Sequence, residues 1–118
     1  MAARTPVLRL SDIIEAIERI RTVLGDMPLE VFETDWQTQW LVERGVEIIS
    51  EASRHLPDAL KARHQHIPWG KVAGIGNILR HNYENIAAPV MWKLAQEDLS
   101  ALEIVCHEEL RAEQERHE

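Results

Sequence analysis

The sequence has few of the residues that mark disulfide scaffolds and β-rich folds. It contains one cysteine, five glycines, five prolines, one tyrosine and one phenylalanine. Cys106 cannot form an internal disulfide, and no signal-peptide pattern is visible, so we expect a reducing, cytoplasmic setting. The low glycine and proline content argues against a chain of tight β-turns. No apolar run approaches the roughly 18 residues of a transmembrane helix, so we expect no membrane association.

Positive charge is also scarce. The chain has 13 Lys and Arg against 20 Asp and Glu, which gives a formal net charge of −7. Broad nucleic-acid binding usually needs a basic surface, so this charge argues against it but leaves room for a small basic site. A length of 118 residues suits one domain with a core and is too short for two. We therefore expect a single domain over residues 1–118.

The sequence does contain strong helical periodicity. Apolar residues recur every three or four positions in segments 10–24, 42–56, 69–83, 90–95 and 99–110. We expect Ser11 to be the N-cap of the first helix, and Asp35 to cap a second long helix that reaches about His55. Short helical turns are expected at 28–33 and 58–63. The pattern predicts an all-α fold, an antiparallel bundle of four or five helices.

Three features fall outside this pattern. For Trp36 and Trp40 we favour core or edge packing, with a subunit interface as the alternative. His64 and His66 stand in a loop with no evident third ligand. We therefore expect two solvated histidines there and predict no metal site. The charged segment 108–118 is expected to be a fraying helix end.

The most unusual stretch runs from Pro68 to Tyr83. Its three glycines each cost a helix interior roughly 1 kcal/mol relative to alanine. Such a local conflict tends to mark a functional surface or the close approach of another chain. Gly70, Gly74, Asn77 and His81 recur at steps of four, three and four, so they share one helix face. We expect a second helix or chain to approach this face.

The end of the same stretch gathers chemically useful side chains. Histidine moves protons near neutral pH, and arginine can hold a phosphate or a developing negative charge. Asn77, Arg80, His81 and Tyr83 therefore form a candidate site for metal-free cleavage of RNA. A second interpretation stays open, in which His81 and Arg80 only complement the dipole at a helix C-terminus.

The run Asn77-x-Leu79-x-His81-x-Tyr83 resembles a motif of the HepT-like branch of the HEPN superfamily. Supporting segments are Ile67-Pro68-Trp69, Val90-x-Trp92, Ile48-Ile49-x-Glu51-Ala52 and Asp98-Leu99-x-x-Leu102. The resemblance spans nearly the whole chain. It implies a small all-α bundle that forms a homodimer or a higher homo-oligomer. Active members resemble metal-independent ribonucleases that act as the toxin of a toxin–antitoxin pair.

The resemblance also implies a partner and residue roles. The partner is a minimal nucleotidyltransferase antitoxin, which uses ATP to place AMP on the motif tyrosine, so no cofactor is expected on this chain itself. His81 matches the catalytic histidine, and Tyr83 matches the modified tyrosine. Asn77 matches the polar residue that usually follows the motif arginine.

The motif arginine itself is missing. In the family it precedes the histidine by four to six intervening residues, and here those positions hold Gly76, Ile75 and Gly74. Either Arg80 supplies the cation, or the chain is an inactive substrate-binding or regulatory subunit of a nucleotidyltransferase complex. A plain helical dimerisation module is a third alternative. The charge of −7 favours an inactive subunit, whereas the retained His81 and Tyr83 favour the ribonuclease, which is our prediction.

Overall fold

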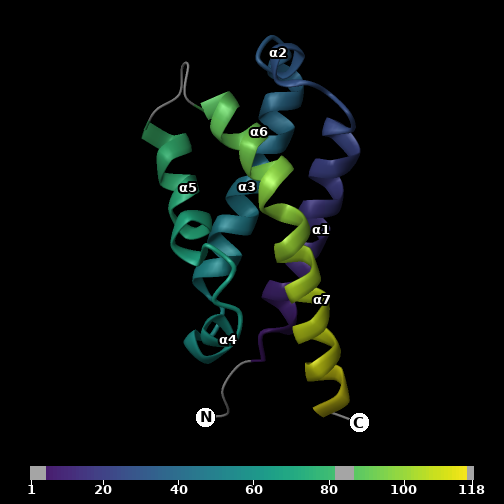
Figure 1. Ribbon diagram of the computed structural model, residues 1–118, viewed down its shortest axis with the longest axis vertical. Helices are drawn as coiled ribbons and strands as arrows, with labels where there is room; N and C mark the ends of the chain where they lie inside the picture. Colours follow the sequence, from purple (N-terminus) through teal and green to yellow (C-terminus); the bar gives the residue numbers. More distant parts are fainter. Residues whose placement is uncertain (1–4, 82–86, 117–118) are drawn as a thin grey trace.

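The computed structural model describes residues 5–81 and 87–116, and this part of the chain is helical with no strand (Figure 1). The helices are α1 (Val7–Leu24), α2 (Leu29–Phe32), α3 (Trp36–Arg54), α4 (Asp58–Arg63), α5 (Trp69–His81), α6 (Ala87–Glu97) and α7 (Leu99–Arg116). The all-α prediction is confirmed, and α2 and α4 are the two expected short turns. Within the described ranges, no helix combines the length and the apolar character needed to span a membrane.

The chain passes along the bundle four times (Figure 1). Helices α1 and α5 run in one direction, and α3 runs in the other. Helices α6 and α7 form one last leg, broken at Asp98, so that the start of α1 and the end of α7 lie at the same end of the molecule. Helix α1 packs against α3 and α7, and α3 packs against α5. This is the antiparallel bundle that the sequence predicts.

The apolar stripes of the long helices meet in one core. Side chains that are at most 2% exposed include Ile13, Ile17, Ile20, Val42, Val46, Ile49, Leu79, Leu94 and Leu102. Burying each such side chain contributes about 1.5–3 kcal/mol. Helices α1 and α3 approach closely at Gly45, where an added Cβ would lie 2.7 Å from Cγ1 of Ile20. Only glycine fits there without displacing that buried side chain.

The two predicted helix starts have different outcomes. Asp35 caps α3 as expected, since its carboxylate accepts the backbone N–H of Thr38 at 3.1 Å. That hydrogen bond, followed by the one from the Thr38 hydroxyl, lowers the pKa of Asp35. The prediction for Ser11 is wrong, because α1 begins at Val7 and includes Ser11. The longer helix buries Leu10 completely, and such packing rather than a cap decides where it starts.

The favoured interpretation of the two tryptophans is core or edge packing, and its core alternative is wrong. Trp36 and Trp40 are 58% and 66% exposed, and their rings pack edge to face with centroids 5.0 Å apart. The neighbouring Leu41 is 58% exposed. This end of α3 therefore presents apolar surface to the outside, and a role in a subunit interface stays a prediction.

Candidate functional site

Helix α5 carries three of the four predicted site residues. Asn77 is exposed, and Arg80 and His81 are the last two positions of the helix, where only the backbone is described. Tyr83 lies outside the described residues. An α-helix turns by about 100° per residue, so positions 77 and 81 lie on one face, and position 80 is about 100° away from position 81.

The two faces of α5 have opposite surroundings. Val72, Ile75 and Leu79 are at most 1% exposed. On the other side, a Cβ added at Gly70 or Gly74 would meet nothing within 4 Å outside the helix's own backbone. We call the surface of Gly70, Gly74 and Asn77 the glycine face. It is open, and it leads along the helix toward position 81.

The positions of the missing motif arginine differ in what they could reach. Ile75 is 1% exposed, and Gly76 is buried. A cation at either position would therefore have to enter the packed side of α5 at a high desolvation cost. Gly74 borders open space. Of the three positions, only Gly74 could present an arginine to a ligand on the glycine face.

Two polar contacts hold the first turn of α5 in place. The indole N–H of Trp69 donates to the carbonyls of Lys61 at 3.2 Å and His64 at 3.0 Å, so α5 begins anchored to α4 and the loop after it. The ammonium of Lys71 pairs with the carboxylate of Asp98 at 2.8 Å. This second contact ties α5 to the junction of α6 and α7.

A third contact joins the middle of α5 to α3. The carbonyl of Ala73 accepts the hydroxyl of Ser50 at 2.7 Å and the guanidinium of Arg54 at 3.2 Å. Ser50 is fully buried, so its hydroxyl needs this partner. The helix that carries the candidate site is thus fixed to three neighbouring parts of the bundle.

A partly buried ionic cluster joins the end of α4 to α7. The carboxylate of Glu109 accepts from Arg63 at 2.7 and 3.2 Å and lies 2.6 Å from Nε2 of His64. The hydrogen bond from Arg63 contributes most to lowering the pKa of Glu109, and the one with His64 adds to it. The expectation of two solvated histidines is wrong for His64, whose side chain is 13% exposed, while His66 is exposed.

The same cluster corrects the prediction of a fraying end over 108–118 as far as residue 116, and residues 117 and 118 lie outside the described ranges. Helix α7 continues to Arg116, and Glu109 and Glu113 are each 6% exposed. Helix periodicity alone did not reveal this, because Glu109 finds its partners at the last residue of α4, Arg63, and at His64 just after it, 46 and 45 residues earlier in the chain. The cluster holds His64, whose backbone carbonyl accepts the indole N–H of Trp69 at the start of α5.

Comparison with known proteins identifies the family. The model of the Ribonuclease HepT-like family matches residues 13–109. "Probable ribonuclease HepT" of Thermococcus cleftensis is 40% identical over 93 residues, which cover 79% of this chain and 84% of that protein. "Putative RNase MJ1380" of Methanocaldococcus jannaschii is 30% identical over 99 residues, or 84% and 91%. No solved structure gives a significant match.

The chain therefore belongs to the HepT-like ribonuclease family. The family match covers α3, α4, α5 and α6 completely, and most of α1 and α7. It agrees with the resemblance read from the motif at positions 77–83. The roles of the individual motif residues stay predictions.

Proposed function

We propose that this chain is a metal-independent endoribonuclease and the toxin of a toxin–antitoxin pair. The observation that carries the proposal is a histidine at the end of an open helix face in a chain that belongs to a ribonuclease family. The glycine face leads to His81 and is free of covering side chains at Gly70 and Gly74. An RNA strand or a second chain can therefore approach along it.

The proposed reaction needs only protein side chains. His81 accepts the proton of a ribose 2′-hydroxyl, and the resulting oxygen attacks the adjacent phosphorus. The bond from phosphorus to the 5′-oxygen breaks, and that oxygen takes a proton from water, whose hydroxide is neutralised by the proton that His81 accepted. The products are a 2′,3′-cyclic phosphate and a free 5′-hydroxyl. Arg80 stabilises the negative charge that develops on the phosphorane, and Asn77 positions the phosphate.

Arg80 takes the place of the missing motif arginine in this proposal. Positions 75 and 76 are buried, so neither is suited to carry a cation for a surface reaction. Arg80 precedes His81 directly, and the 100° between them allows both side chains to border one groove. A second subunit across the glycine face would complete that groove.

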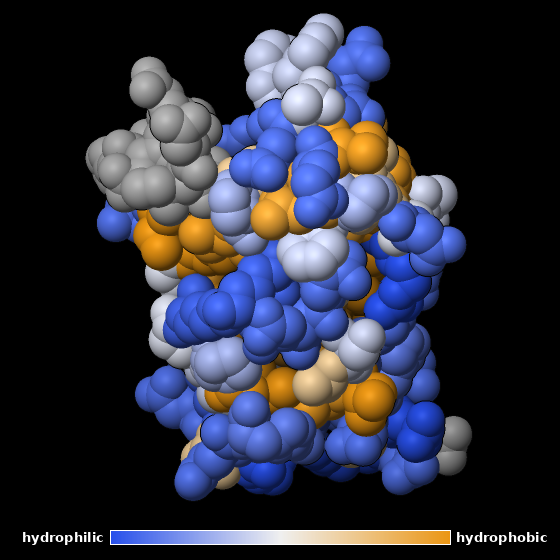
Figure 2. All heavy atoms as spheres, turned by 45° about the horizontal axis from the view of Figure 1, so that its top comes forward, coloured by the Kyte–Doolittle hydropathy of each residue, from blue (hydrophilic) through white to orange (hydrophobic). Residues whose placement is uncertain are grey.

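We further propose that the active form is a homodimer, or a larger homo-oligomer. The open glycine face and the exposed Trp36 and Trp40 are the two surfaces that support this. Tryptophan is enriched at subunit interfaces. Figure 2 shows apolar surface between polar side chains on the face drawn there, as expected for a chain with exposed apolar groups.

Control of the toxin is proposed to act on Tyr83. A minimal nucleotidyltransferase partner would transfer AMP from ATP to the Tyr83 hydroxyl and release pyrophosphate. The added phosphate puts negative charge two residues along the chain from His81, and such a charge repels the RNA backbone. Tyr83 is the single tyrosine of the chain, so Tyr83→Phe should abolish incorporation of labelled AMP. Undiminished labelling of that variant would place the control site elsewhere.

A second candidate function has its own support. No basic residue occupies positions 74–76, and the formal net charge is −7. Both observations favour an inactive chain that serves as the substrate-binding or regulatory subunit of a nucleotidyltransferase complex. This candidate keeps AMP transfer to Tyr83 and lacks RNA cleavage.

The deciding experiment is RNA cleavage by the purified protein in the presence of EDTA. Wild type is compared with Arg80→Ala and with Arg19→Ala, an exposed arginine on α1. Cleavage lost in Arg80→Ala but kept in Arg19→Ala supports the ribonuclease with a displaced cation. Absence of cleavage by the wild type, with AMP still accepted, favours the inactive subunit.

A further inference from the structure

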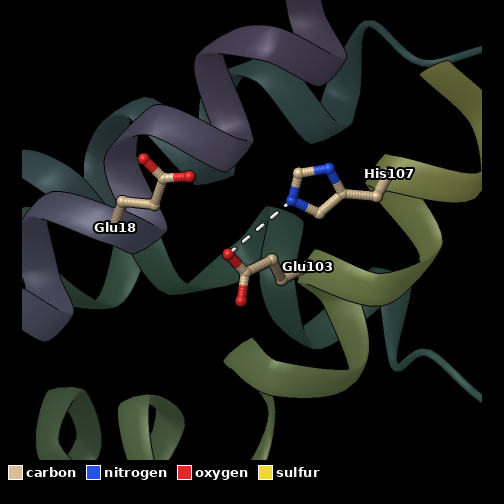
Figure 3. Close-up of side chains that lie close together, drawn as sticks. All are labelled: Glu18, Glu103 and His107. Atoms are coloured by element: carbon tan, nitrogen blue, oxygen red, sulfur yellow. Dashed lines mark ion pairs between the residues drawn. The ribbon is translucent and has the colours of Figure 1, made fainter. Parts of the chain in front are cut away.

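Three potential metal ligands meet on the side of the bundle formed by α1 and α7. They are Glu18 of α1 and Glu103 and His107 of α7, and their side chains point toward one another (Figure 3). One ligand atom from each of the three lies within 4.8 Å of the other two. Helix α5 lies on the opposite side of the bundle in Figure 1, so this cluster is separate from the candidate ribonuclease site.

The two residues on α7 have a spacing that allows both to bind one metal ion. Glu103 and His107 are four residues apart, which places them one helical turn from each other. Nε2 of His107 lies 3.8 Å from Oε2 of Glu103. That distance is too long for a hydrogen bond, and the contact is an ion pair only when His107 is protonated (Figure 3).

Arg21 fixes the orientation of the Glu103 carboxylate. Its guanidinium pairs with Oε1 of Glu103 at 2.9 Å, and the side chain of Glu103 is 18% exposed. The other oxygen, Oε2, is the one that faces His107. Outer contacts of this kind orient the ligands of metal sites in proteins. Arg21 thus holds one carboxylate oxygen toward the gap that Glu18 borders from α1.

The charge and donor types suit a divalent cation. Two carboxylates stand against the single guanidinium of Arg21, which leaves the gap negative. Imidazole nitrogen and carboxylate oxygen are both zinc ligands, with bond lengths of about 2.0–2.2 Å. Ligand atoms around a tetrahedral zinc ion then lie roughly 3.3 Å apart. Glu18 and His107 are exposed, so rotation of their side chains can close the remaining distance.

We infer that Glu18, Glu103 and His107 bind a zinc ion, with water in the remaining coordination position. Such an ion joins the first long helix to the last one. Because it binds the folded chain through two separate helices, it raises the stability of the fold. The inference replaces our expectation of no metal site, and it does not depend on the proposed ribonuclease activity.

The chain offers a matched control on α3. Glu51 and His55 have the same spacing of four residues, and Nε2 of His55 lies 2.9 Å from the carboxylate of Glu51. An arginine, Arg54, also pairs with that carboxylate. The only group of three metal-ligating side chains found among the described residues is the one on α1 and α7. The pair on α3 therefore tests whether a Glu and a His four residues apart are enough to bind zinc without a third ligand.

The test is calorimetric titration of metal-free protein with zinc chloride, combined with thermal unfolding. We expect one zinc ion per chain and a higher unfolding temperature with zinc. Glu18→Gln and His107→Gln should each weaken binding at least about tenfold and remove the thermal shift, whereas His55→Gln should retain both. Circular dichroism without zinc checks that each variant is folded.

Two results would overturn the inference. One is equal zinc affinity in wild type, Glu18→Gln and His107→Gln, and the other is loss of binding in His55→Gln alone. Neither result changes the outcome of the cleavage experiment, because that assay contains EDTA and tests residues of α5.

Discussion

The two faces of α5 differ in how far the bundle covers them, and we propose that one serves stability and the other function. One face carries Val72, Ile75 and Leu79 and is sealed into the core. The other carries Gly70 and Gly74, where nothing lies within reach of an added Cβ. Each glycine costs the helix about 1 kcal/mol, a cost the fold does not require at these open positions. Such a loss of helix stability is expected where another molecule must approach the backbone.

The largest effect on stability should come from the buried face. Leu79→Ala removes a side chain with no exposed area and should lower the free energy of unfolding by about 2–5 kcal/mol. Asn77→Ala, on the open face of the same helix, should change it by no more than about 0.5 kcal/mol. Denaturant unfolding measures both. Equal losses in the two variants would contradict the division between the faces.

The next largest effect on stability should come from the contacts of Glu109 on α7 with Arg63 and His64, which precede α5. Glu109→Gln weakens the hydrogen bonds from Arg63 and His64 and should cost about 1–3 kcal/mol at neutral pH. His66→Gln, in the same loop but exposed, should cost little.

The lowered pKa of Glu109 adds a pH dependence. A carboxyl whose pKa is depressed by folding stabilises the protein above its unfolded pKa, for which the reference value is 4.5. That contribution disappears as the pH falls through the folded value. Wild type should therefore lose its advantage over Glu109→Gln below about pH 4.5 in unfolding measured across pH. A difference that stays constant down to low pH would show that Glu109 acts without its charge.

A smaller effect, with opposite signs, should distinguish two glycines. Gly70→Ala should raise the free energy of unfolding by up to about 1 kcal/mol, because the helix gains and nothing is displaced. Gly45→Ala should lower it by about 1–2 kcal/mol, because its Cβ would fall 2.7 Å from Ile20. Thermal unfolding of the pair tests this. Destabilisation by Gly70→Ala would mean that the glycine face is closed in solution.

The smallest effect on the single chain should accompany a change of assembly. Gly70 is exposed, and a Cβ added there would meet nothing within 4 Å outside the helix's own backbone, so the fold should tolerate Gly70→Glu. A charge on an apposed face should disrupt a homodimer, and sedimentation velocity should show monomers. Lys93→Glu, an exposed change on α6, is the control and should keep the wild-type size. An unchanged dimer in Gly70→Glu would move the interface to another surface, such as that of Trp36 and Trp40.

Local periodicity predicted much of this fold. The spacing of Val42, Val46 and Ile49 identified the buried stripe of α3, and Asp35 identified its cap. The same spacing could have placed Trp40 outside the core, since two residues turn a helix by about 200° and Trp40 precedes Val42 by two.

The remaining features depend on contacts between distant parts of the chain. Glu109 is buried where Arg63 and His64 reach it from the end of α4, more than forty residues earlier. Gly70 and Gly74 border open space because none of the other described helices covers that side of α5. A local sequence pattern does not contain this information. The shared face of positions 77 and 81 follows from helix geometry alone and was predictable.

The role of His81 is tested most directly by measuring RNA cleavage and unfolding on the same preparations of His81→Ala and His66→Ala. We expect His81→Ala to lose at least about 100-fold in cleavage rate with EDTA present, while its unfolding free energy stays within about 0.5 kcal/mol of wild type. His66→Ala should match wild type in both. Cleavage by His81→Ala at the wild-type rate would contradict the assignment of the open end of α5 as the active site.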